Sequence, residues 1–154
     1  MSHVRPETRQ PLREPFDASH PPVLAIYCSD GRFTNAVESL ARAAGHDRVD
    51  TLTLPGGPAL LCPAAANLSE VDTVSRAAQF LIEGHKTQHL VLVAHQGCGY
   101  YRKRYPRLPD AHIEKHQLDH LAVASKALAR KYPELHIERY YARVDQGMIE
   151  LHPV

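Results

Sequence analysis

Two short segments contain the side chains whose types and spacing could do chemistry. They are Cys28-Ser29-Asp30-Gly31-Arg32 and His95-Gln96-Gly97-Cys98-Gly99. Two thiolates and one neutral imidazole form a standard zinc-binding set, and sulfur ligands favour zinc over magnesium or calcium. His95 and Cys98 are three residues apart in a glycine-rich turn, a spacing tight enough for one ion. We therefore predict that Cys28, His95 and Cys98 bind one zinc ion, with water or Asp30 at the fourth position.

Each of these residues also has a purely structural interpretation. Cysteine is often a small core residue, and a loop histidine often only satisfies a local hydrogen bond. The joint placement favours a metal site, because Cys28, His95 and Cys98 all lie close to the ends of the two most apolar segments of the chain. Cys62 follows two leucines without ligand spacing to any partner, so we expect it to be a buried apolar residue.

The elements that must position these residues follow from the hydrophobic pattern. Residues 23–27 (VLAIY) and 90–94 (LVLVA) are continuous apolar runs, typical of strands covered on both faces. Further strands are predicted at 49–54 and 136–144, and helices at 35–44, 69–84 and 113–132. This alternation predicts a three-layer α/β fold with a mainly parallel sheet of four to five strands flanked by helices. Ligands of such sheets bind beyond the carboxyl ends of the strands, where the two polar segments lie.

Local signals predict how some of these elements begin and where they lie. Asn35, with Glu38 three residues on, is expected to cap the first helix, and Ser69, with Asp72 in the first turn, the second. The segment 136–144 is more polar than the other strands, which favours the edge of the sheet. We therefore expect it to be the last and outermost strand.

Length and composition indicate one ordinary domain. The chain has 154 residues, of which 44% are hydrophobic and 23% charged. Residues 1–21 are polar and rich in proline, which predicts an arm without a core of its own, followed by a single α/β zinc-binding domain over 22–154. Three cysteines are an odd number, which fits a disulfide framework poorly and is compatible with a reducing compartment.

Charge and hydropathy exclude several classes of partner. The net charge of +1 predicts neither nucleic-acid nor membrane-surface binding, and no apolar run approaches a membrane span. The first residues lack the apolar core of a secretory signal, so a cytoplasmic location is expected. The aromatic and basic residues 100–104 are expected at the rim of the site or in a dimer contact. His112, His116 and His120 share one face of a predicted helix, which is expected to face solvent or a subunit contact.

The paired motif C-x-D-x-R and H-x-x-C-G resembles that of the β-class carbonic anhydrases. The matching residues are Cys28, Asp30, Arg32, His95 and Cys98. The resemblance implies that the two cysteines and the histidine bind zinc, that Asp30 and Arg32 form a dyad beside the metal, and that the chain forms a homodimer or higher homo-oligomer. It also implies that family's α/β fold over most of the chain.

The loop after the second predicted strand differs from the family pattern. The family usually has Arg-Asn-Ala-Gly there, whereas this chain has Leu-Pro-Gly-Gly-Pro at 54–58. Backbone N–H groups of successive glycines can form an anion-binding concavity. We therefore predict that Gly56 and Gly57 contact the substrate through their backbone.

The resemblance implies a zinc lyase, carbonate dehydratase, that hydrates carbon dioxide reversibly to bicarbonate. Zinc-bound hydroxide would attack the carbon, Asp30 would orient it, and Arg32 would keep Asp30 ionised and turned away from the metal. Two other hypotheses remain open. One is hydrolysis of a related small molecule, carbonyl sulfide or carbon disulfide. The other is a non-catalytic, zinc-stabilised module that binds a small anion or a partner.

Overall fold

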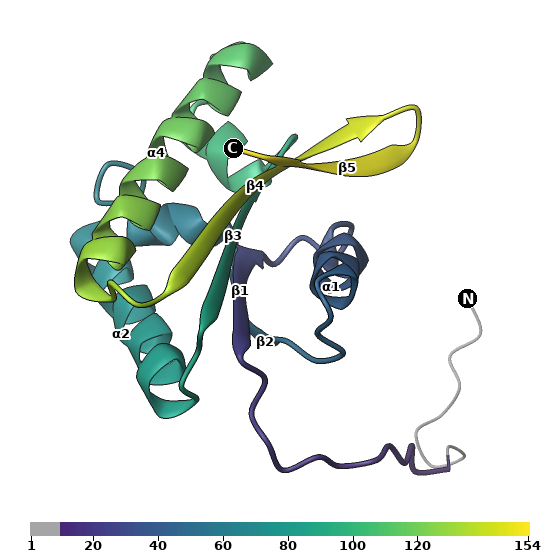
Figure 1. Cartoon of the computed structure of the whole chain (residues 1–154). Coiled ribbons are helices and arrows are strands. Elements are labelled where there is room, and N and C mark those ends of the chain that lie inside the picture. Colours follow the sequence, from purple (N-terminus) through teal and green to yellow (C-terminus); the bar gives the residue numbers. More distant parts are fainter. Residues whose placement is uncertain (1–9) are drawn as a thin grey trace.

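Strands and helices alternate along the part of the chain that the computed structural model describes, residues 10–154 (Figure 1). The strands are β1 (Val23–Cys28), β2 (Asp50–Leu54), β3 (His89–His95), β4 (His136–Asp145) and β5 (Met148–Pro153). The helices are α1 (Thr34–Ala43), the 3₁₀ helix η2 (Gly57–Leu61), α2 (Leu68–Gly84), α3 (Gly99–Arg104) and α4 (Asp110–Lys131). The predicted order of elements is therefore confirmed, with α3, η2 and β5 added.

The five strands form one sheet in the order β2-β1-β3-β4-β5. The first four strands are parallel to their neighbours, and β5 pairs antiparallel with β4. The prediction of a mainly parallel sheet is confirmed. The β1 and β3 runs are buried along almost their whole length, as expected for central strands whose two faces are both covered.

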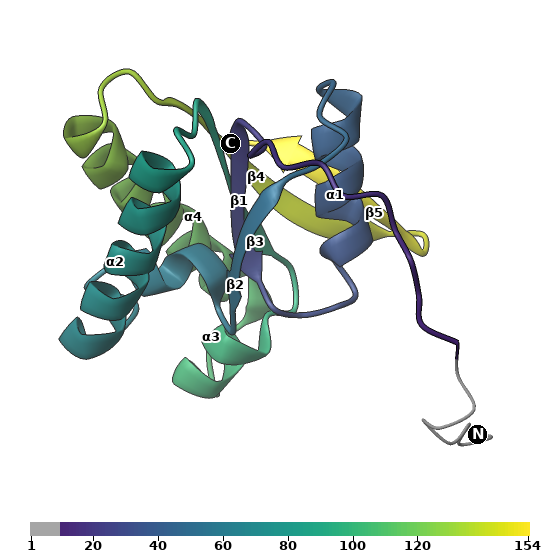
Figure 2. The same cartoon turned by 90° about the horizontal axis from the view of Figure 1, so that it is seen from below.

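Helices cover both faces of this sheet. Figures 1 and 2 show α2 and α4 on one face and α1 on the other. The larger core lies under α2 and α4, where Leu24, Ile26, Leu90 and Leu92 are fully buried. Fully burying one such side chain contributes about 1.5–3 kcal/mol to folding. The two most apolar strands therefore form a rigid centre for the residues that follow them.

Two of the predicted helix starts are wrong. Helix α1 begins after Phe33, which makes no side-chain cap, so Asn35 lies inside the helix. Helix α2 begins after Asn67, whose side chain accepts a hydrogen bond from the Glu70 N–H at 2.8 Å, while the Glu70 carboxylate accepts one from the Asn67 N–H at 2.9 Å. This reciprocal capping box satisfies two unpaired donors and leaves Ser69 in the first turn.

The prediction that 136–144 is an edge strand is also wrong. Strand β4 lies between β3 and β5, and the edges of the sheet are β2 and β5. The turn at Gln146 and Gly147, both with positive φ, reverses the chain so that β5 covers the outer side of β4. The polar residues at the start of β4 are tolerated because β5 pairs only with Tyr140–Asp145 and leaves residues 136–139 without a strand on their outer side.

The histidine face of the long helix is less exposed than expected. His120 is buried, and its Nδ1 lies 2.9 Å from the Tyr101 hydroxyl oxygen. The His116 ring stacks on Tyr105 with centroids 4.7 Å apart, and only His112 is exposed. The expectation of a solvent-facing row is wrong because α3, a short helix that the sequence pattern did not predict, packs Tyr101 against this face.

The described part of the N-terminal arm, residues 10–21, contacts the body of the protein around residues 17–20. Arg48 binds the Asp17 carboxylate at 2.9 Å and the Ser19 carbonyl at 2.8 Å, and the His20 ring stacks on His85. The first nine residues of the predicted arm lie outside the described residues. Among the helices of residues 10–154, none is both long and apolar enough to cross a membrane.

Candidate metal centre

The parallel pairing of β1 and β3 brings the candidate ligands to one edge of the sheet. Cys28 is the last residue of β1 and His95 the last of β3, and the register pairs Tyr27 with Val93. The turn after β3, in which Gly97 has a positive φ, returns Cys98 toward them. All three side chains are buried, and their ligand atoms lie within 4.8 Å of one another. The structure thus brings together the three residues that the sequence singled out.

The His95 ring is held in one orientation. Its Nδ1 lies 2.8 Å from the Gln96 carbonyl oxygen, and a carbonyl only accepts, so Nδ1 carries the proton. The other nitrogen, Nε2, then presents a lone pair. It is buried and has no hydrogen-bond partner within residues 10–154. A buried polar atom without a partner is costly, by about 1–3 kcal/mol. A metal ion between Nε2 and the two sulfurs would satisfy it, so the donor set fits zinc.

The cysteines form a pair in which one thiolate is strongly favoured. The hydrogen bond with Cys98 lowers the pKa of Cys28 to about 4, outweighing the effect of burial. The nearby His95 side chain and the backbone N–H groups of Gly56 and Asp30 add to the shift. The same hydrogen bond and burial raise the pKa of Cys98. The thiolate is the form of cysteine that binds metals, so this environment favours ligation.

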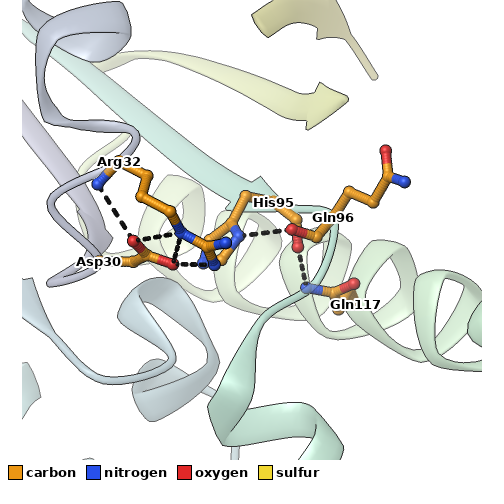
Figure 3. A network of polar contacts seen from close by, with 5 residues as sticks. All are labelled: Asp30, Arg32, His95, Gln96 and Gln117. Atoms are coloured by element: carbon orange, nitrogen blue, oxygen red, sulfur yellow. Dashed lines mark hydrogen bonds and ion pairs between the residues drawn. The ribbon is translucent and has the colours of Figure 1, made fainter. Parts of the chain in front are cut away.

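Asp30 and Arg32 form the predicted dyad beside the buried cluster (Figure 3). The guanidinium contacts both carboxylate oxygens, with Nη2 to Oδ2 at 2.6 Å and Nε to Oδ1 at 3.0 Å, and the Arg32 backbone N–H donates to Oδ1. These hydrogen bonds lower the pKa of Asp30 to about 2. The Asp30 side chain is only 21% exposed, whereas that of Arg32 is 72% exposed. Arg32 therefore contacts the carboxylate from the solvent side and fixes its orientation.

A second series of hydrogen bonds, which includes a residue of α4, supports the backbone of His95. The Gln117 side-chain amide donates to the His95 carbonyl at 2.8 Å (Figure 3), and the Tyr141 hydroxyl donates to Gln117 Oε1 at 3.0 Å. Gln117 is 2% exposed and Tyr141 1%. Sequence reasoning missed both residues. The signal was a polar residue within the apolar stripe of α4, between Ile113 and Leu121.

The two glycines after β2 are required by close packing. Gly57 has φ +52°, and a Cβ there would lie 2.5 Å from the Tyr27 carbonyl carbon and 2.6 Å from the Cys28 nitrogen. Gly56 has φ +88°, and its Cβ would meet the Tyr100 ring at 2.8 Å. The loop therefore approaches the end of β1 closely enough to reach the Cys28 sulfur. That these glycines also contact a substrate stays a prediction.

Comparison with known proteins identifies the family. A family model described as "Putative carbonic anhydrase" matches residues 19–151, most of the chain. Solved β-carbonic anhydrases share its fold. The chain belongs to the putative carbonic anhydrase family, and its fold is that of the β-carbonic anhydrases. The identification from the paired sequence motif is thereby confirmed.

Several solved β-carbonic anhydrases are similar to this chain over most of its length. CafA of Aspergillus fumigatus is 18% identical with a TM-score of 0.53, covering 86% of this chain and 76% of its own. A tetrameric enzyme of Sordaria macrospora is 14% identical with a TM-score of 0.56, covering 87% and 81%. Isoform I of Trichomonas vaginalis is 13% identical with a TM-score of 0.56, covering 92% and 87%. No curated protein matches the sequence.

Within this β-carbonic anhydrase fold, the third cysteine, Cys62, is a core residue and not a candidate metal ligand. Cys62 is fully buried in the apolar cluster that also contains Cys28, Cys98 and Tyr101. It is a free thiol outside the group of converging ligand atoms. The structure therefore places Cys62 in the core, as the sequence predicted.

The Gln117 chain yields a prediction about stability. Replacing Gln117 with Leu should lower the free energy of unfolding by about 1–3 kcal/mol for each buried group left unpaired, namely the His95 carbonyl and the Tyr141 hydroxyl. Urea unfolding measures the change. The control is Gln79→Leu, which removes a surface glutamine that bonds Lys131 and should change stability by no more than about 0.5 kcal/mol. Equal effects of the two substitutions would contradict the role given to Gln117.

Proposed function

We propose that the protein hydrates carbon dioxide reversibly to bicarbonate, with one zinc ion bound by Cys28, His95 and Cys98. The observation that carries this proposal is the buried His95 Nε2, which has no partner among residues 10–154 and lies within 4.8 Å of two cysteine sulfurs. Family membership supports carbon dioxide as the substrate. Zinc in this position would supply a Lewis acid that makes water nucleophilic near neutral pH.

The charge of the site suits this chemistry. Two thiolates and one neutral imidazole would balance the charge of a zinc ion, so the site needs no further ligand charge. Asp30 lies outside the three converging ligand atoms and is engaged by Arg32 instead. A fourth coordination position is therefore left for water, as catalytic zinc sites require.

Asp30 acts on the reacting water as a hydrogen-bond acceptor. A carboxylate with a pKa near 2 is ionised at any pH at which the enzyme would work, and an ionised carboxylate only accepts hydrogen bonds. It therefore fixes the direction of the water hydrogens and leaves an oxygen lone pair for the carbon of the substrate. Arg32 keeps both carboxylate oxygens occupied and so holds Asp30 off the metal ligands.

The loop at Gly56 and Gly57 is proposed to face the substrate oxygens. Gly56 donates its N–H toward the Cys28 sulfur, which lowers the thiol pKa. Gly57 opens the 3₁₀ helix η2, and the first N–H groups of a helix have no acceptor within it. The Gly57 N–H is thus the donor we assign to the developing bicarbonate.

Metal content tests the ligand assignment. Protein purified with zinc, and then dialysed to remove ions from sites without sulfur ligands, should hold about one ion per chain by elemental analysis. Cys98→Ser should lose most of it because one of three ligands is gone. The matched control is Cys62→Ala, which removes a buried thiol outside the ligand group and should keep the zinc. Folded wild-type protein that cannot take up zinc would contradict the ligand assignment.

The dyad is tested by stopped-flow hydration of carbon dioxide. Asp30→Asn should keep zinc and lose activity by about 10²–10⁴-fold, the contribution typical of a side chain positioned on a reacting proton. Arg32→Ala should also lose activity while zinc affinity holds or rises, because Asp30 is then free to turn toward the ligands.

The control for the dyad is Asp72→Asn, which breaks an exposed ion pair with Arg76 and should leave the rate unchanged. A fully active Asp30→Asn protein would refute the mechanism. Inactivity of the zinc-loaded wild type toward carbon dioxide, with sulfide released from carbonyl sulfide, would instead identify the hydrolase. Inactivity toward both would favour the non-catalytic binding module.

We also propose that the chain forms a homodimer in which the arm packs on the partner. Leu12 and Phe16, in the arm, are 87% and 91% exposed, which is unfavourable for large apolar side chains unless they are covered. The related enzyme of Sordaria macrospora is tetrameric.

Sedimentation tests this assembly. Wild-type protein should sediment as a dimer or larger assembly. The double variant Leu12→Ser, Phe16→Ser should associate more weakly, with a higher dissociation constant, because it has less apolar area to bury. The control is Phe80→Ser, which removes an exposed aromatic residue of α2 and should leave association unchanged. A wild-type monomer at high concentration would rule the dimer out.

A further inference from the structure

A second group of metal-binding side chains lies at the other end of the same strands. His89 is the first residue of β3 and His136 the first residue of β4, and the parallel register pairs them directly. Glu138 is two residues further along β4, so its side chain leaves the same face of the sheet as that of His136. The sheet therefore presents two imidazoles and a carboxylate side by side.

The three side chains converge on one point. His89 Nε2 lies 2.8 Å from Glu138 Oε2, and His136 Nε2 lies 3.6 Å from Glu138 Oε1. The two imidazole rings are 4.9 Å apart between centroids. Their ligand atoms all lie within 4.8 Å of one another, the same range as in the Cys28, His95 and Cys98 group. Both histidines thus present the same ring nitrogen to the same carboxylate.

Neighbouring residues hold this arrangement in place. The Tyr140 hydroxyl donates to Glu138 Oε2 at 3.3 Å, and the His46 ring lies 6.0 Å from that of His89. The Glu138 carboxylate is therefore oriented by an outer hydrogen bond, as metal-ligating carboxylates are.

We propose that His89, His136 and Glu138 form a second, independent site for a borderline divalent ion such as Zn²⁺ or Co²⁺. Imidazole nitrogen and carboxylate oxygen are ligands that these ions accept, and two histidines with one carboxylate are a recurring zinc set. Without metal, each Nε2–H can donate a hydrogen bond to the Glu138 carboxylate. The bound ion would replace these protons and lie between the nitrogens and the carboxylate oxygens. Water completes its coordination on the exposed side, where the His136 side chain is 68% accessible.

This site is separate from the proposed catalytic one in position and in chemistry. His89 and His95 are the two ends of β3, which places them about 20 Å apart at roughly 3.3 Å per residue. The catalytic set contains two sulfurs, whereas the second contains only nitrogen and oxygen. An ion bound here would tie the starts of β3 and β4 together and stabilise the folded state, because the ligands are assembled only by strand pairing.

The test is a titration with Co²⁺ of protein dialysed until it holds one zinc per chain, followed by calorimetry and visible absorption. Wild-type protein should bind about one additional Co²⁺ per chain, without the intense thiolate-to-cobalt absorption that exchange into a cysteine site would produce. His136→Ala and Glu138→Gln should each weaken this event at least tenfold. Tyr140→Phe should weaken it by about 10-fold, as expected for an outer-shell partner.

The matched control is His152→Ala. His152 Nε2 also contacts a carboxylate, that of Glu150, at 3.0 Å, but it does so on β5 without a second histidine in the ligand group. This variant should bind the additional Co²⁺ as wild type does. His136 is exposed, so its variant should keep the wild-type melting temperature without added metal, which confirms folding.

Two results would overturn the proposal. One is a wild type that holds one zinc per chain and takes up no Co²⁺. The other is additional binding that is the same in His136→Ala and Glu138→Gln as in wild type. Both readouts are independent of carbon dioxide hydration, so an inactive protein with an intact second site would count against the proposed function alone.

Discussion

The parallel pairing of β1 with β3 is the constraint on which the rest of the site depends. Cys28 and His95 are far apart in the chain, and only this pairing places their side chains at one edge of the sheet. The strands can pair at the centre because their side chains are apolar on both faces and helices cover each face. A shift of the register by one residue would turn these side chains to the opposite faces, so burial of the strands also fixes the orientation of the site.

Around this edge, the sequence departs from the rules that govern an ordinary core. His95 is buried with one unpartnered nitrogen within the described residues, two thiols are in contact, and an ionised aspartate lies next to them. Each feature is unfavourable for folding alone, and such conflicts are expected at functional sites. The supporting contacts limit the cost. Gln96 fixes the imidazole, Gln117 holds the His95 backbone, and Arg32 holds Asp30.

The two ends of β3 illustrate how one strand can serve two chemistries. At its carboxyl end the neighbours supply sulfur in a buried setting, where hydrogen bonds favour the Cys28 thiolate. At its amino end the neighbours supply a carboxylate and a second imidazole in a partly exposed setting. Donor type and burial, rather than the strand itself, therefore distinguish the two groups. The rigidity of the central sheet keeps them independent, because neither group shares a side chain with the other.

The sequence by itself determined the fold class, the two central strands and the five residues of the paired motif. Those features depend on local patterns: apolar runs of strand length and polar residues at fixed positions directly after them. The tertiary structure alone decided which residues support them. Gln117 meets His95 and Tyr141, and Tyr101 meets His120, only because α3 and α4 pack against the end of the sheet. The place of β4 inside the sheet depends on the hairpin that adds β5. Hydrophobic periodicity describes each segment separately and so does not predict which strands pair. Local pattern fixes what each segment can form, whereas long-range packing fixes which side chains become neighbours.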